Sequence, residues 1–151
     1  FACVWSGDSR IYLLRGGQYA QVTEDHTEVN ELLRTGAITP EQALTWPRRN
    51  VITRAIGVHE LPRTDERSGP LVDGDTFLLC SDGLTEHVED FEMAEALIAY
   101  DPQTACNALV QLTLSRGAKD NVTVLVVRCR DKAAQQGLRT TTDADDWQVG
   151  I

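Results

Sequence analysis

Residues 76–83 read TFLLCSDG, a short apolar run that ends in a serine, an aspartate and a glycine. The run follows a turn-like Asp-Gly-Asp at 73–75 and contains no breaker, so it predicts a central strand. A second aliphatic run, Val122 to Val127, is the clearest strand of the chain and begins just after Asp120. If the two strands pair antiparallel, Asp82 and Asp120 meet at one edge of the sheet.

Each of these aspartates alone is typical of a turn or a helix cap, because Asp and Gly are the commonest turn residues. Two carboxylates held together repel each other strongly unless a cation lies between them. Mg²⁺ and Mn²⁺ prefer carboxylate oxygens, and strand ends aim short side chains well. A third aspartate, Asp8, lies in a Gly-Asp-Ser turn. The pattern therefore points to a divalent-metal site at Asp82 and Asp120, and Asp8 is a further candidate by residue type and position in a turn.

Strands are predicted on both sides of a helical insertion in the first half of the chain. An extended run at 1–5 precedes two strands, 11–14 and 19–22, which flank a pair of glycines suited to a hairpin, and we expect the three to form an antiparallel meander. A helix is predicted over 27–34 with Thr27 as its cap, and a capping box starts a second helix at Thr39. A strand is predicted at 51–53.

Two longer helices are predicted in the second half. Asp90 can cap a helix that runs through Tyr100, and Asp101-Pro102 starts another that runs through Ser115 and stops at Gly117. On the first of them the apolar face is expected to contain Met93, Ala94, Leu97 and Ile98. This element order is α+β, with the two long helices covering one face of a sheet.

The composition excludes several classes of protein. The 151 residues are 42% hydrophobic and 25% charged, which is ordinary for a globular domain. A net charge of −9 opposes binding to nucleic acid, which depends on lysine and arginine. No apolar run is long enough for a membrane span, and no signal peptide is present, so a cytoplasmic protein is expected. The four cysteines form no CxxC pair and are expected to be reduced.

Five motifs, in order, resemble the bacterial type 2C (PPM) protein phosphatases and together cover nearly everything from residue 2 to 128. They read GDSRIY at 7–12, TEDH at 23–26, PRRNVITRAIG at 47–57, GD at 74–75 followed by LLCSDGL at 78–84, and RG at 116–117 followed by DNVTV at 120–124.

The resemblance implies the C-terminal part of a four-layer αββα sandwich over residues 1–130, with a polar, flexible tail at 131–151. It implies that Asp82 and Asp120 hold one of two catalytic Mn²⁺ or Mg²⁺ ions, and that Asp8 and Asp82 hold a weaker third ion. Residues 27–49 correspond to the family's flap beside the active site. A metal-activated water would hydrolyse phosphoserine and phosphothreonine, with no protein nucleophile.

The resemblance also implies what is missing. The remaining metal ligands, the phosphate-binding arginine and the proposed acid belong to sequence before Phe1, so the segment alone is expected to be inactive, and His26, His59 and His87 are read as structural. The implied partners are phosphorylated proteins, the targets of a serine/threonine kinase. Two alternatives stay open: a catalytically inactive regulatory or binding module, and another branch of the superfamily, such as phosphatases of anti-anti-sigma factors or of secretion systems.

Overall fold

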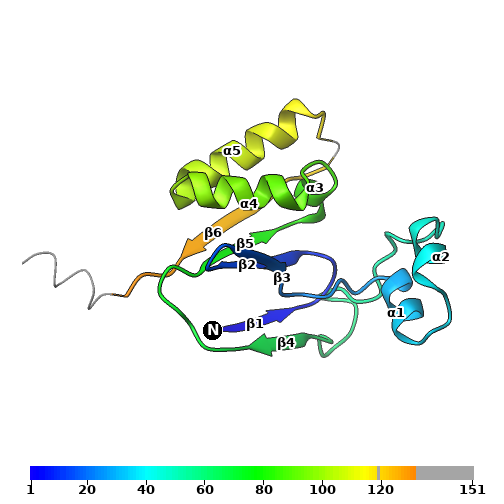
Figure 1. Ribbon diagram of the computed structural model, residues 1–151. Coiled ribbons are helices and arrows are strands. Elements are labelled where there is room, and N and C mark those ends of the chain that lie inside the picture. The colour runs from blue at the N-terminus through cyan, green and yellow to red at the C-terminus, as the bar shows by residue number, and fades with distance from the viewer. Residues whose placement is uncertain (119, 132–151) are drawn as a thin grey trace, which may run out of the picture.

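The structure, a computed structural model, describes residues 1–118 and 120–131. Its elements are β1 (Ala2–Trp5), β2 (Arg10–Arg15), β3 (Gln18–Gln21), α1 (Glu28–Arg34), α2 (Pro40–Leu44), β4 (Asp65–Ser68), β5 (Thr76–Cys80), α3 (Asp82–Thr85), α4 (Asp90–Ala99), α5 (Pro102–Ser115) and β6 (Val124–Arg128). The central sheet has the order β3-β2-β5-β6, and β1 and β4 form a separate two-stranded sheet. Helices α4 and α5 cover one face of the central sheet, and β1 and β4 lie beyond its other face (Figure 1).

The predicted strand at 76–80 is the centre of the molecule. β5 pairs antiparallel with β2 on one side and with β6 on the other. Tyr12, Leu78 and Val126 lie opposite one another in this register, and all three are buried in the core beneath α4 and α5. The antiparallel pairing that would bring Asp82 and Asp120 to one edge is therefore confirmed.

The two long helices form as predicted, with two corrections to α4. Asp101 caps α5 by accepting hydrogen bonds from the backbone N–H groups of its first turn. α4 begins one residue earlier than expected, because Glu89 occupies the cap position and shares a capping box with Glu92. Leu97 is fully buried, but its neighbour Ile98 is 64% exposed, so the predicted apolar face was too wide.

The predicted three-stranded meander is wrong. β1 pairs with β4, whereas only β2 and β3 form the expected hairpin. The turn after β1 explains the difference: Gly7 has a φ of 105°, and its carbonyl oxygen accepts a 2.9 Å bond from the N–H of His26. The chain therefore crosses from one sheet to the other instead of folding back on itself. β4 escaped prediction because its sequence, Asp-Glu-Arg-Ser, is polar and exposed throughout.

Two other strand predictions need correction. Residues 51–53 form only a single bridge, between Ile52 and Thr27, and Ile52 is 45% exposed. β6 starts at Val124 instead of Val122, because the N–H of Thr123 donates to the side chain of Ser81 and not to a strand backbone. The helix predictions at 27–34 and from Thr39 are confirmed, including the capping box at Thr39.

The described residues agree with the expected C-terminal part of an αββα sandwich. They supply one helix layer, the central sheet and the two-stranded piece, and all strand pairs are antiparallel. The predicted tail at 131–151 lies outside the described residues except for its first position. All four cysteines are free thiols, as expected. Over 1–118 and 120–131, no helix combines the length and apolar character that crossing a membrane requires.

A buried ion pair joins β2 to the start of β5. The Asp75 side chain is fully buried, and both of its oxygens accept 2.7 Å bonds from Arg15. The N–H of Val72 donates a further 2.9 Å bond to Asp75. The bonds from Arg15 hold the pKa of the Asp75 carboxyl below its usual range, although burial opposes them.

Stability should therefore depend on Asp75 in a pH-specific way. Because its pKa is lower in the folded state, the ionised carboxylate stabilises the fold above about pH 4, and this contribution disappears as the pH falls through the folded-state pKa. Asp75→Asn should unfold at lower urea concentration than wild type at pH 7, with a difference that shrinks below about pH 4. The control is Glu95→Gln, which changes an exposed carboxylate. An Asp75→Asn deficit that stays constant from pH 7 to pH 3 would contradict the ion-pair explanation.

Candidate metal centre

The loops that carry Asp82 and Asp120 are joined where β5 ends and β6 begins. The N–H of Ser81 donates to the carbonyl oxygen of Thr123 at 3.2 Å. The Ser81 hydroxyl oxygen accepts from the N–H of Thr123 at 3.1 Å and donates to the carbonyl oxygen of Asn121 at 3.2 Å. Ser81, the residue before Asp82, is thus hydrogen-bonded to Thr123 and to Asn121, the residue after Asp120.

Gly83 lets the two loops approach closely. A Cβ at this position would lie 2.4 Å from the carbonyl oxygen of Asn121, which is closer than real Cβ contacts come. Asp82 is the first residue of α3, where its Oδ1 accepts a 2.8 Å bond from the N–H of Gly83. The sequence placed Asp82 in a turn at a strand end, so the short helix is a correction. We call this junction of Ser81, Gly83 and Asn121 the β5–β6 seam.

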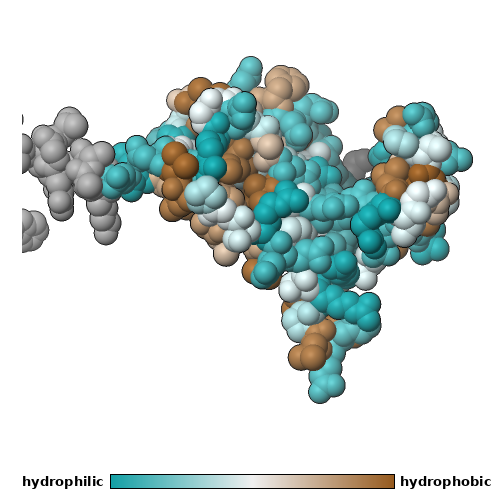
Figure 2. Space-filling view, turned by 60° about the horizontal axis from the view of Figure 1, so that its bottom comes forward, coloured by the Kyte–Doolittle hydropathy of each residue, from teal (hydrophilic) through white to brown (hydrophobic). Residues whose placement is uncertain are grey.

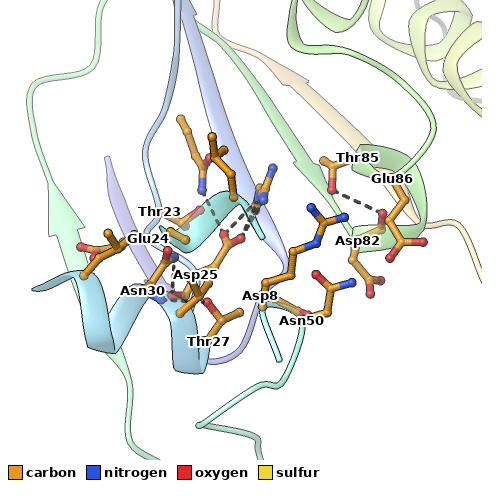
Figure 3. A pocket seen from close by; sticks show the side chains of 17 residues that line it. Asp8, Thr23, Glu24, Asp25, Thr27, Asn30, Asn50, Asp82, Thr85 and Glu86 are labelled. Atoms are coloured by element: carbon orange, nitrogen blue, oxygen red, sulfur yellow. Dashed lines mark hydrogen bonds and ion pairs between the residues drawn. The ribbon is translucent and has the colours of Figure 1, made fainter. Parts of the chain in front are cut away.

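Asp8 and Asp82 line the same pocket, which has a volume of about 920 Å³. In Figure 3, Asp8 lies between Asp25 and Asp82, and Glu86 lies beside Asp82 on the α3 side. The pocket is bounded by the sheet edge, by α3 and by residues of the predicted flap. Segments separated by some seventy residues of sequence thus contribute acidic side chains to one cavity.

The acidic cluster affects the protonation of Asp8. Partial burial raises the pKa of the Asp8 carboxyl, and the negative charges of Asp82 and Asp25 raise it further. A cation bound among these oxygens would relieve both effects, because it replaces lost solvation and offsets the mutual repulsion. The donor set therefore fits a hard divalent cation.

Asp120 lies outside this pocket, although the seam holds its loop beside α3. Its Oδ1 accepts a 2.6 Å bond from the N–H of Asn121, and its side chain is exposed. Throughout the part of the chain that the structure describes, no three His, Cys, Asp or Glu side chains gather closely enough to hold a metal ion. Of the three predicted ligands, Asp8 and Asp82 therefore lie in the cavity, and Asp120 does not line it.

Arg10 and Asp25 form an ion pair beside Asp8 that the sequence did not single out. The Arg10 guanidinium donates to both carboxylate oxygens of Asp25, at 2.7 and 3.0 Å, and Gln21 donates to one of them at 3.1 Å. Asp25 lies within the TEDH motif, in which the sequence suggested a role only for His26. Glu86 also lines the pocket. Its spacing of four residues from Asp82 would have placed the two side chains on one helical face, but only if the short helix α3 had been predicted.

His26 has a structural role, as predicted. Its Nδ1 accepts a 3.1 Å bond from the N–H of Gly7, which leaves Nε2 to donate to Asp65 at 3.1 Å. Its ring stacks on Trp5 at a centroid distance of 6.2 Å. These contacts fasten the turn that carries Asp8.

Cys80, the last residue of β5, has an unreactive thiol at neutral pH. Burial raises the pKa of the Cys80 thiol to about 12, so almost none of it is thiolate. Cys80 packs in the hydrophobic core as a small apolar side chain.

Residues 39–130 match the family described as Stage II sporulation protein E (SpoIIE). The serine/threonine phosphatase stp of Listeria innocua is 44% identical over 122 residues, which are 80% of this chain and 48% of that protein. The serine/threonine protein phosphatase PstP of Mycobacterium tuberculosis is 45% identical over 149 residues, which are 96% of this chain and 29% of that protein.

Solved structures agree with these relatives. PppA of Pseudomonas aeruginosa, described as a key regulatory component of T6SS, has a TM-score of 0.73 and 46% identity over 84% of this chain and 51% of that one. The PstP catalytic domain in complex with two manganese ions has a TM-score of 0.69 and 41% identity over 86% of this chain and 54% of that one. The chain thus spans about half the length of most of the structures and curated relatives described here.

Replacing Gly83 by alanine tests the close approach at the seam. The new Cβ would meet a backbone oxygen at 2.4 Å, so one of the two loops must move. The higher helix propensity of alanine would stabilise the protein by at most about 1 kcal/mol. Forced displacement in a packed region typically destabilises it by about 1–3 kcal/mol. We therefore expect a net loss in the free energy of unfolding, measured by urea denaturation.

Gly69→Ala is the matched control for this prediction. Its new Cβ would meet only the ring of Phe1, at 3.2 Å, and a side chain can turn away where a backbone oxygen cannot. A Gly83→Ala protein as stable as Gly69→Ala would mean that the seam tolerates a side chain and does not fix the spacing of the two loops.

Proposed function

The chain belongs to the type 2C (PPM) phosphatase family, and we propose that it forms the C-terminal part of an enzyme that hydrolyses phosphoserine and phosphothreonine in proteins. The observation that carries the proposal is the β5–β6 seam, which places the loops of two predicted ligands side by side at the edge of an acidic pocket. Relatives with 39–45% identity are named serine/threonine or protein phosphatases, which supports the same chemistry.

Asp82 and Asp120 are proposed to hold one catalytic ion from the two sides of the seam, and Asp8 to hold a further, weaker ion together with Asp82. Mn²⁺ or Mg²⁺ bound there would supply a water of lowered pKa as nucleophile and would offset the charge of the phosphoryl group. The protein's own part is to hold carboxylates at fixed positions. Ser81 and Gly83 fix the two loops, and His26 and Arg10 fasten the segments on either side of Asp8.

A second feature supports the proposal that the complete enzyme contains a further segment. On the face of the central sheet away from α4 and α5, the paired residues are apolar in two rows, Ile11–Leu79–Leu125 and Leu13–Phe77–Val127. Phe1 covers Phe77, but Leu125 and Val127 remain 52% and 44% exposed. Apolar side chains lie at the surface on the underside of the molecule, next to polar ones (Figure 2). Burying this face would stabilise the sheet.

The substrates are proposed to be phosphoproteins produced by a serine/threonine kinase, and the place of action to be the cytoplasm. Neither nucleic acid nor lipid is required by the site, whose charged groups are mainly carboxylates. The presence of aspartates at both 82 and 120 favours the enzyme over a phosphatase-like binding module, because a binding module would not need both.

The function is tested with the full-length protein and phosphothreonine peptides. Asp82→Asn and Asp120→Asn should each reduce Mn²⁺-dependent kcat/KM at least about tenfold, because losing a ligand weakens metal binding at least as much as losing one of its supporting groups. Asp90→Asn, which removes an exposed carboxylate from the first turn of α4, should keep the wild-type rate. Wild-type rates in both ligand variants would refute the ligand assignment. No turnover by wild type would favour the binding module.

The isolated segment of residues 1–151 should not turn over p-nitrophenyl phosphate with Mn²⁺. Its described residues bring no three potential ligands together, so they cannot fill the coordination shells of two ions. The full-length protein, assayed in parallel, provides the positive control. Mn²⁺-dependent turnover by the segment that disappears in its Asp82→Asn variant would show that the proposed second set of ligands is unnecessary.

A further inference from the structure

The pocket beside Asp8 and Asp82 has a second wall, made of apolar side chains. Val29 and Leu33 of α1 and Ala43 and Leu44 of α2 line it. Val29 and Leu33 are four residues apart, so they lie on the same face of their helix. Neither helix has a buried residue, and Leu44 is 76% exposed. These four side chains, the flap wall, therefore face the cavity without belonging to the core of the described fold.

Hydrogen bonds fasten the flap instead of apolar packing. Asn30 of α1 donates to the carbonyl oxygen of Asp25 at 3.0 Å. The Trp46 indole donates to Glu28 at 3.1 Å, and the Thr53 hydroxyl donates to Glu31 at 2.7 Å. The flap wall takes no part in these bonds. It is free to contact a molecule that enters the pocket.

The size and the lining of the pocket restrict what that molecule can be. A volume of about 920 Å³ is near the upper end of the roughly 300–1,000 Å³ typical of ligand pockets, so the cavity holds more than one phosphorylated side chain. Five acidic residues line it, against two arginines: Asp8, Glu24, Asp25, Asp82 and Glu86, with Arg10 and Arg49. Metal ions bound to Asp8 and Asp82 would offset this excess of three negative charges. An acidic neighbour is instead disfavoured at the apolar wall, because a carboxylate placed there would lose hydration without gaining a partner.

We propose that the flap wall is a subsite for an apolar side chain next to the phosphorylated residue of the protein substrate. The inference rests on the proposed phosphatase function and adds a substrate class to it: phosphoprotein segments with an aliphatic neighbour and without acidic neighbours. The wall and the carboxylates bound one continuous cavity, so a short peptide reaches both at once. Apolar contacts in such a pocket discriminate between side chains by about 10–200-fold, and an open wall belongs at the lower end of this range, about tenfold.

The test uses the full-length protein with Mn²⁺ and sets of phosphothreonine peptides. In each set a single leucine, asparagine or glutamate occupies one of the positions from two before to two after the phosphothreonine. The measured quantity is the ratio of kcat/KM between the leucine peptide and the asparagine peptide, which have side chains of similar size. At one or more positions we expect a ratio of about ten, with the glutamate peptide no better than the asparagine peptide.

Variants then locate the preference. Leu33→Asn and Leu44→Asn should each bring the leucine-to-asparagine ratio of kcat/KM to within about twofold of one. Because both values of a ratio come from the same variant, the ratio does not depend on the fraction of enzyme that is active. Leu44 is mostly exposed, so its replacement leaves the fold intact even if Leu33→Asn does not. Leu32→Asn is the matched control, because Leu32 lies on α1 but does not line the pocket, and it should keep the wild-type ratio.

The outcomes separate this inference from the proposed function. Hydrolysis of p-nitrophenyl phosphate and of all peptides with leucine-to-asparagine ratios near one overturns the subsite and leaves the phosphatase standing. A preference that survives in both Leu33→Asn and Leu44→Asn, or a preference for glutamate, also overturns the subsite. Absence of turnover with every substrate overturns the phosphatase function, and the subsite with it.

Discussion

The antiparallel pairing of β5 with β6 is the constraint on which the rest of the structure depends. The register sets Cys80 opposite Val124, so the chain leaves β5 and enters β6 at the same edge of the sheet. Beyond that edge one further backbone bond joins the N–H of Ser81 to the carbonyl oxygen of Thr123, and the hydroxyl of Ser81 adds two more links between the loops. Only a glycine fits at position 83, because the carbonyl of Asn121 occupies the space of a side chain. A buried sheet therefore ends in two loops whose separation is fixed by backbone contact.

The contrast between the two sides of the pocket follows from how each side is built. The carboxylate side grows out of the sheet, where the core beneath α4 and α5 keeps the backbone rigid. The flap side is two short helices without buried residues, fastened by single hydrogen bonds. Rigid positions suit metal ligands, which tolerate little displacement. A lightly attached wall suits the recognition of varied protein segments, since loops and short elements change without disturbing the core.

Sequence patterns predicted the parts of the fold that depend on local chemistry. Thr39 formed its capping box and Asp101 its cap, because these residues satisfy backbone groups a few positions away. The partners of β1 could not be predicted, because β4 is a polar strand with no alternation and the crossing at Gly7 depends on His26, nineteen residues further on. In the site, Asp82 was predicted from its position at a strand end and Asp8 from its turn, and both line the pocket. Asp25 and Glu86 were missed, because the first depends on a distant arginine and the second on a one-turn helix.

We propose above all that Asp82 and Asp120, whose loops are held together by the β5–β6 seam, bind the same divalent ion. The most direct measurement is a crystal structure of the full-length protein soaked in Mn²⁺, with the ions located by anomalous scattering. We expect one manganese site with carboxylate oxygens of both residues within coordination distance. Two aspartates that point to different ions, or an Asp120 that remains turned toward the N–H of Asn121 with no metal beside it, would contradict the account.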